Sequence, residues 1–227
     1  MSISAQEWDV TPKEAVVLQK ELREQVKLVP LTGLPKTIGG CDVSMNRFAT
    51  SGYAGFITLS YPRLEEIAHS VVKEKISFPY IPGLLSFREI PMLLRAWEKL
   101  EKKPDVLIVD GIGIAHPRRL GIATHLGLIL RIPTIGCAKS VLIGVYEEPG
   151  AEPGSISYLR DPKAHNEIVG AALRTKKNVK PVFISPGHLI TLSESIEIAK
   201  RCVLTHRLPE PTRLAHNTVN AYRVADQ

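Results

Sequence analysis

Hydrophobic residues in this chain fall into two kinds of segment, short extended runs and longer amphipathic stretches. Residues 38–45, 52–60 and 65–78 are extended runs separated by short turns, and they predict an antiparallel meander of three strands. Residues 106–109 are apolar throughout, which is typical of a parallel strand covered on both faces, and residues 133–138 predict another short buried strand. We therefore expect an α/β fold with a mixed sheet, in which the meander precedes the parallel strands.

Amphipathic stretches at helical spacing fill the intervals between these runs. Thr11 and Glu14 form a capping box, which predicts that a helix begins there. The apolar spacing then predicts a helix that ends near residue 102 and two more over residues 120–130 and 193–203. Because helices and apolar strands alternate here, we expect these strands to pair in parallel, with helices flanking the sheet.

No linker or repeat divides the 227 residues, so we expect a single domain over residues 1–227. Weaker strand signals in residues 141–180 indicate a peripheral hairpin inserted into this domain, and residues 207–213 are interpreted as an extended, proline-rich tail. Residues 1–10 do not show the basic start and apolar core of a signal peptide, and no run approaches about 20 apolar residues. We therefore expect a cytoplasmic protein without membrane association.

The charge of the chain favours an anionic partner, and its cysteine content disfavours a disulfide-stabilised or zinc-binding protein. Lysine and arginine outnumber aspartate and glutamate by 29 to 23, which permits a polyanionic partner such as nucleic acid. Cys41, Cys137 and Cys202 are odd in number and share no CxxC spacing. This spacing disfavours disulfides and a zinc site, so buried free thiols are expected.

Three carboxylates stand where this arrangement could bring them together. Asp110 ends the apolar strand, and α/β sheets gather their chemistry at such strand ends. Asp42 lies in the first strand on the face opposite Cys41, where an acid is either solvated or functional. Pro91 fits the first position of a helix, which would leave Glu89 free at the helix mouth.

Each of these acids also has a plain structural interpretation. Asp110 could cap the next helix, Asp42 could face water, and Glu89 could close a capping box with Ser86. The order of the elements is nevertheless that of a ribonuclease H-like fold. If the strands of Asp42 and Asp110 pair, both carboxylates come within reach of one magnesium ion, which prefers oxygen ligands.

Four sequence blocks, FPYIPGLLSFRE, DGIGIAHPRRLGIATHLG, GCAKS and RLPEPTR, closely resemble those of endonuclease V in order and spacing. The resemblance covers about residues 40–216 and implies a magnesium-dependent endonuclease of nucleic-acid repair, with manganese as a substitute. It implies recognition of deaminated purines, above all inosine, in DNA, with inosine-containing RNA as a further candidate. We expect the protein to be a monomer. The cut would fall at the second phosphodiester on the 3′ side and leave 3′-hydroxyl and 5′-phosphate ends.

The resemblance also suggests a role for individual residues in catalysis and metal binding. It implies that Asp42 and Asp110 bind the metal and that Glu89 is the third catalytic acid. His216 falls where relatives carry a histidine or an acid, and we expect it to assist catalysis.

Other matched residues are expected to contact the nucleic acid. The proline-containing loop over residues 79–82 is expected to bind the nucleic acid, with Tyr80 as an exposed wedge between bases. His116 and Lys139 would face the phosphate that is cut. Ile112 and Ser140 depart from the family pattern, which bears on fine substrate preference. The loop residues are Pro79, Tyr80, Ile81 and Pro82, and the expected pocket for the displaced base comprises Gly83, Leu85, Gly111 and Gly113.

The sequence is also compatible with two other functions. The chain could bind distorted or inosine-containing nucleic acid without cutting it, in which case the three acids would be spectators. A phosphotransferase built on the same sheet is a third possibility by analogy of fold, although no phosphate-cradling glycine loop supports it.

Overall fold

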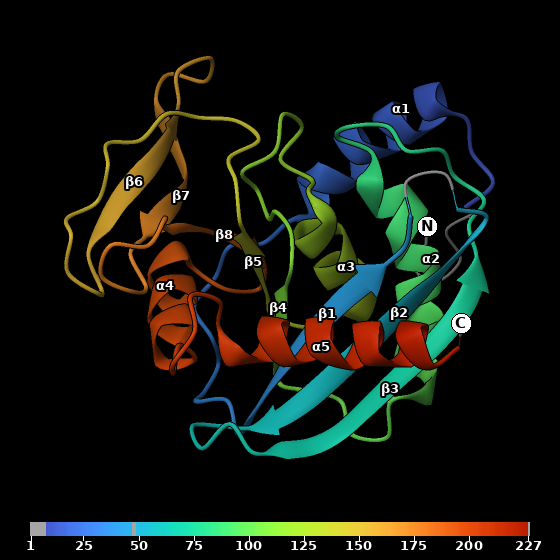
Figure 1. Cartoon of the computed structure of the whole chain (residues 1–227). Coiled ribbons are helices and arrows are strands. Elements are labelled where there is room, and N and C mark those ends of the chain that lie inside the picture. Colours follow the sequence, from blue (N-terminus) through green and yellow to red (C-terminus); the bar gives the residue numbers. More distant parts are fainter. Residues whose placement is uncertain (1–7, 47–48, 227) are drawn as a thin grey trace.

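The computed structural model describes residues 8–46 and 49–226. Within these ranges, eight strands form one sheet in the order β3-β2-β1-β4-β5-β8-β7-β6 (Figure 1). The strands are β1 Thr37–Ser44, β2 Ser51–Ser60, β3 Glu66–Lys75, β4 Val106–Val109, β5 Thr134–Ala138, β6 Ile156–Asp161, β7 Glu167–Leu173 and β8 Val182–His188.

Strand pairing confirms the predicted mixed sheet. The first three strands form the antiparallel meander, and β1 pairs in parallel with β4, which pairs in parallel with β5. β8 then runs antiparallel to β5, and the predicted hairpin is present as β6 and β7. Because β7 pairs with β8, this hairpin continues the sheet at its far edge.

Helices cover both faces of the sheet and confirm the predicted fold class. α2 and α3 pack on one face, whereas α4 and α5 pack on the other (Figure 1). The capping box predicted at Thr11 and Glu14 starts the first helix. The helices are α1 Pro12–Leu22, the short 3₁₀ helix η2 Arg23–Gln25, α2 Leu85–Lys99, α3 Ile122–Leu130, α4 Leu192–Arg201 and α5 Glu210–Ala225. No described helix has the length and hydropathy needed to span a membrane.

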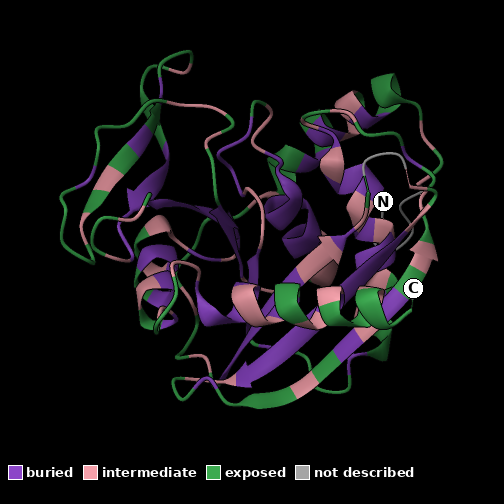
Figure 2. Ribbon diagram, viewed as in Figure 1, coloured by how far each residue is buried: buried purple, intermediate pink, exposed green. Residues whose placement is uncertain are grey.

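β4 lies inside the sheet and its four residues are buried. Figure 2 shows that buried residues concentrate in the sheet and on the inner sides of the helices. Side chains of a strand alternate between its two faces. Ile108 accordingly packs in a cluster with Ile196 of α4, whereas Leu107 packs in another with Leu126 of α3. Burial of each such side chain contributes about 1.5 to 3 kcal/mol. These contacts hold the end of β4, where Asp110 follows, in a fixed position. As predicted, Cys41, Cys137 and Cys202 are buried free thiols.

The prediction of an extended tail after residue 207 was wrong, because α5 begins at Glu210. Pro209 is the N-cap and Pro211 lies in the first turn, where a helix needs no backbone N–H donor. α5 then packs closely on β1 at Gly40, where a Cβ would lie only 1.9 Å from the carbonyl oxygen of Pro211. His216 therefore lies on a well-packed helix that crosses β1.

The predicted start of α2 was also wrong. The helix begins at Leu85, so Pro91 lies inside it and Glu89 lies one turn from its start. Pro91 removes one backbone hydrogen bond, but the apolar face of the helix, including Ile90 and Leu93, is buried against the sheet. This burial outweighs the preference of proline for a helix start. No capping bond from Ser86 is formed, since the N-cap is Leu84.

Candidate active site

The register of two parallel strands brings Asp42 and Asp110 together. Cys41 of β1 pairs with Val109 of β4, and each aspartate is the next residue along its strand. Both carboxylates are largely buried, with 12% and 15% of their side-chain surfaces exposed. Asp42 contacts His216 of α5, so its side chain lies on the face of the sheet that α5 covers. The sequence indicates that an acid on this face is either solvated or functional.

Glu89 approaches the two aspartates from α2. All three acids line one cavity of about 210 Å³, together with Cys41, Val109 and Ile122. Burial, then the charges of Asp42 and Asp110, raise the pKa of Glu89 to about 8. The pKa of Asp42 is also raised, first by burial and then by Asp110. The carboxylates therefore repel one another in the metal-free protein.

A chain of hydrogen bonds from α5 orients His216 toward Asp42. The Nδ1 atom of His216 lies 2.8 Å from Oδ2 of Asp42, and its Nε2 atom lies 2.8 Å from the amide nitrogen of Asn220. The Ser44 hydroxyl donates to the Asn220 side-chain oxygen at 2.7 Å, which leaves the Asn220 amide nitrogen as the donor to His216. The ring then donates from Nδ1 to the carboxylate.

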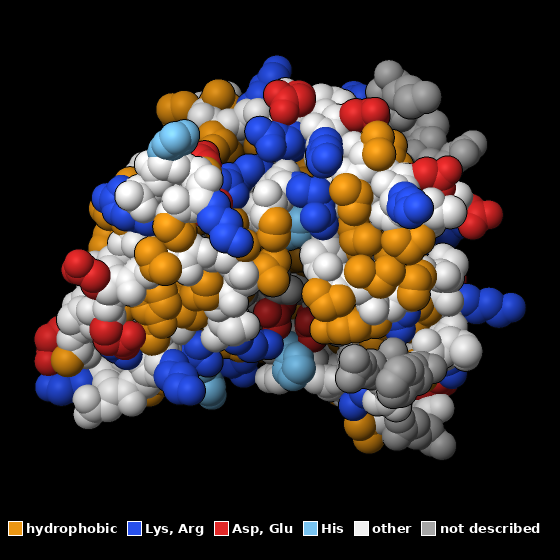
Figure 3. Space-filling model, turned by 90° about the horizontal axis from the view of Figure 1, so that it is seen from above, with side chains coloured by type: hydrophobic (Ala, Val, Ile, Leu, Met, Phe, Trp, Pro, Cys, Tyr) orange, Lys and Arg blue, Asp and Glu red, His pale blue; other side chains and the backbone are white. Residues whose placement is uncertain are grey.

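Lys139 faces Asp110 from the end of β5. Its Nζ atom lies 2.5 Å from Oδ2 of Asp110, and 45% of its side chain is exposed. A flexible ammonium group in this position neutralises the carboxylate and can move to an incoming phosphate. Figure 3 shows acid side chains at the bottom of a hollow, a histidine beside them, and hydrophobic side chains on both rims.

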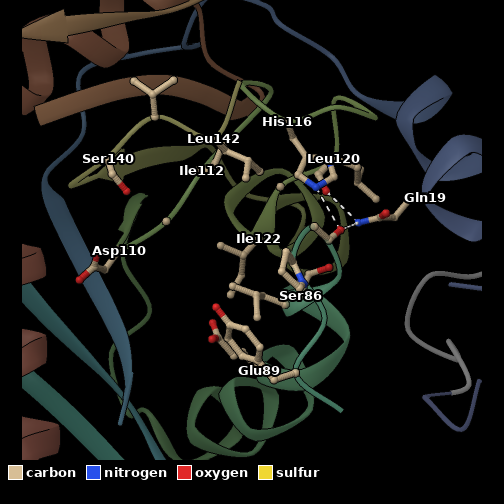
Figure 4. Close-up of a pocket in the computed structure, with 17 residues that line it drawn as sticks. Gln19, Ser86, Glu89, Asp110, Ile112, His116, Leu120, Ile122, Ser140 and Leu142 are labelled. Atoms are coloured by element: carbon tan, nitrogen blue, oxygen red, sulfur yellow. Dashed lines mark hydrogen bonds between the residues drawn. The ribbon is translucent and has the colours of Figure 1, made fainter. Parts of the chain in front are cut away.

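A second cavity of about 330 Å³ opens beside the acids and falls within the usual size range of small-ligand sites (Figure 4). Glu89 and Asp110 line both cavities, so the two spaces meet at these carboxylates. The other lining groups are mostly apolar or backbone. They include Tyr80, Pro82, Gly83, Leu85, Ser86, Gly111, Ile112, Leu120, Ile122, Val141 and Leu142.

The loop before α2 forms one rim of this second cavity. Pro79 and Pro82 are exposed and Ile81 packs partly against Phe78 and Phe87. Tyr80 is 49% exposed in the free protein, as predicted from the sequence. A ring held between prolines at the rim of a pocket can contact a ligand with little further ordering.

The donor set suits a hard divalent cation, because it consists of carboxylate oxygens whose mutual repulsion such an ion would relieve. Asp42 and Asp110 directly follow the paired residues Cys41 and Val109, so strand register brings them together. Among the residues placed by the structure, no three His, Cys, Asp or Glu side chains already converge at metal-binding spacing. A hydrogen bond from His216 and an ion pair with Lys139 occupy the two aspartates instead.

A comparison with known proteins gives the family. The family model described as Endonuclease V matches residues 20–217. Endonuclease V from Myxococcus xanthus is 48% identical over 221 residues, which are 96% of this chain and 92% of that protein. The chain belongs to the Endonuclease V family. Its members are nucleases, so the acids described above lie in the fold of a hydrolytic enzyme.

Solved structures of this family have the same fold. Endonuclease V from Bacillus subtilis superposes with a TM-score of 0.91 at 31% identity, covering 100% of this chain and 98% of that chain. Endonuclease V from Ciona intestinalis, in complex with DNA containing an inosine followed by a ribo-adenosine, gives 0.83 at 29% identity and covers 95% and 98% of the two chains.

Of the other residues expected at the site, His116 lines the second cavity whereas Gly113 does not. His116 is only 3% exposed, and its ring lies in the wall of the second cavity, 3.0 Å from the carbonyl oxygen of Gly83. It lines the same cavity as Glu89 and Asp110, and in the free protein its ring is hydrogen-bonded to the pocket wall. Gly113 does not line the cavity, because it packs against Pro186, whose carbonyl oxygen would lie 2.2 Å from an added Cβ. Gly83, Leu85 and Gly111 do line it.

Sequence reasoning missed two polar residues that hold the site in place. Asn220 follows His216 by four residues, a spacing that aligns side chains on a helix, but the tail was not expected to be helical. Gln19 contacts the second cavity from α1 and lies one residue before the range that the family model matches. Its spacing in the sequence gives no signal of that contact.

Proposed function

We propose that this chain is a divalent-metal-dependent endonuclease that recognises deaminated purines, above all inosine, in nucleic acid. It cuts the second phosphodiester on the 3′ side of the lesion and leaves 3′-hydroxyl and 5′-phosphate ends. DNA is the principal substrate, and inosine-containing RNA is a further one. The enzyme acts in the cytoplasm as a single-domain monomer.

One observation carries this proposal, namely that a base-sized cavity and an acidic cavity meet at Glu89 and Asp110. An enzyme that inspects one base must take it out of the stack and hold it in a pocket. A strand with one base in the larger cavity would lead its backbone past the carboxylates. The Ciona intestinalis complex with inosine-containing DNA supports the same class of substrate.

Asp42 and Asp110 would hold the metal ion, which is magnesium, with manganese as a substitute. When bound, the ion polarises the phosphate and stabilises charge on the leaving oxygen. His216, held by Asn220, and Glu89 orient the attacking water beside these aspartates. Lys139 exchanges Asp110 for the phosphate and adds positive charge where negative charge develops.

Tyr80 fills the space that the displaced base leaves. Its position on the cavity rim and its 49% exposure allow the ring to enter a base stack. An aromatic ring stacked on a base contributes about 1 to 3 kcal/mol. Pro79 and Pro82 keep the loop stiff, so little conformational freedom is lost on binding.

Mapping of the cleaved ends tests this proposal. End-labelled DNA and RNA strands, each with one inosine, would be incubated with magnesium or with a chelator. We expect magnesium-dependent cleavage at the second phosphodiester 3′ to inosine, and products that a ligase accepts without prior phosphorylation. Tight binding without cleavage, in magnesium as well as in the chelator, would instead support the non-cleaving binder.

A further inference from the structure

The carbonyl oxygen of Gly83, in the wall of the base-sized cavity, is surrounded by three side-chain donors. The Gln19 amide nitrogen lies 3.1 Å from it, the His116 Nε2 atom 3.0 Å and the Arg118 Nη2 atom 2.8 Å (Figure 4 draws the first two). A carbonyl oxygen has two lone pairs, so this acceptor is fully used. Gly83 itself has a φ of +80°, which side-chain-bearing residues rarely adopt.

The hydrogen bonds around His116 fix its tautomer. The backbone N–H of Arg118 donates to Nδ1 of the ring at 3.2 Å, so Nδ1 is an acceptor. Nε2 must then carry the hydrogen that is donated to Gly83. Burial, followed by the charge of Arg118, lowers the pKa of His116 to about 4, which keeps the ring neutral near pH 7. His116 is therefore a fixed donor to the pocket wall.

Gln19 links two walls of the cavity. It is 1% exposed, and its amide nitrogen donates to Gly83 and, at 3.2 Å, to the carbonyl oxygen of Leu120. Its side-chain oxygen accepts from Nε of Arg118 at 2.5 Å. Gly83 lies before α2 and Leu120 lies before α3, and both line the cavity. The buried amide of Gln19 thus bridges these loops with its N–H donors, while its oxygen accepts from Arg118.

We propose that Gln19 is a positioning residue that, with Arg118 and His116, fixes the Gly83 carbonyl and the distance between the two cavity walls. This role makes Gln19 a determinant of base selectivity although it lies outside the acidic site. The inference rests on the proposed function, because the cavity is assigned there to the displaced base. Backbone groups can read a base only while their orientation is held by surrounding contacts.

Substitution of Gln19 by methionine tests this role. Gln19→Met keeps side-chain length and helix propensity but removes both N–H donors and the acceptor for Arg118. Gln25→Met is the matched control, since Gln25 is exposed in η2. The readout is kcat/KM on an inosine strand divided by that on the same strand with adenosine. We expect Gln19→Met to lower this ratio about tenfold and Gln25→Met to leave it unchanged.

The division between kcat and KM separates a positioning role from general damage. Gln19→Met leaves the acids untouched, so we expect the loss in KM for inosine, with kcat within about twofold of wild type. Arg118→Met should give a similar loss, and the double variant no more than the larger single loss, because both act on one carbonyl. Gln19→Glu, which keeps an acceptor for Arg118, provides a second variant if Gln19→Met does not fold.

Failure of this inference differs from failure of the proposed function. If the wild type shows no preference for inosine, the proposed function is wrong. If the wild type prefers inosine and folded Gln19→Met or Gln19→Glu keeps the full preference, the positioning role is wrong. A fall in kcat with unchanged KM, or strictly additive losses with Arg118→Met, would also overturn it.

Discussion

Glu89 should destabilise the metal-free protein progressively as the pH rises. Its pKa is raised from 4.5 to about 8, first by burial and then by Asp42 and Asp110. The unfolded chain therefore releases this proton near pH 4.5, whereas the folded protein keeps it until about pH 8. Stability falls between these values because the folded state binds more protons, and the loss reaches about 5 kcal/mol as an upper limit.

Glu89→Gln removes this titration while keeping the size of the side chain. In the presence of a chelator, the variant and the wild type should melt at similar temperatures at pH 4. At pH 9 the variant should melt higher by on the order of 10 °C, since 1 kcal/mol shifts the Tm of a domain of this size by about 2 to 4 °C. Thermal melts across this pH range give the comparison.

Glu98→Gln is the matched control, because Glu98 lies on the same helix with 63% of its side chain exposed. It should leave the melting temperature nearly unchanged at every pH. Magnesium should raise the melting temperature of the wild type most at pH 8 to 9, where the acids repel one another. A Tm difference between Glu89→Gln and wild type that does not vary with pH would refute a carboxyl with a raised pKa at this position.

The remaining predictions concern the other groups of the site. Asp110→Asn should abolish cleavage in a single-turnover assay yet keep or raise the melting temperature, since it relieves the repulsion between the carboxylates. A lowered melting temperature would contradict this expectation. Tyr80→Ala should leave the Tm within about 2 °C of wild type but weaken binding to an inosine strand about tenfold, as measured by titration. A lowered Tm with intact binding would instead place Tyr80 in the core. Lys139→Met should reduce the slope of log Kd against log salt by about 1, and an unchanged slope would exclude a phosphate contact.

Much of the fold and of the acidic cluster was predictable because local patterns coincide with the tertiary arrangement. The all-apolar run of β4 predicted a strand covered on both faces, and parallel pairing with β1 then placed Asp110 beside Asp42. The nearness of these residues follows from strand register alone. Glu89 was predicted as a partner of the aspartates, although the helix that carries it begins earlier than expected.

The remaining features depend on packing that the sequence does not display. Prolines beside Glu210 indicated an extended tail, but their places at the start of α5 are compatible with a helix, and Gly40 lets that helix approach β1. His116 stands among charged residues in its motif, yet burial makes it a neutral part of a pocket wall. Gln19 is 64 positions from Gly83, so only the folded chain shows their contact.

Cleavage of one oligonucleotide that carries either inosine or adenosine at a single position tests the proposed function most directly. Both strands would be incubated with wild-type protein in magnesium and in a chelator, with Asp110→Asn as the inactive control. The predicted result is that wild-type protein rapidly cleaves the inosine strand, only when magnesium is present, and that Asp110→Asn does not cleave it. Equal cleavage of both strands, or cleavage that persists in the chelator, would contradict a metal-dependent enzyme that selects deaminated purines.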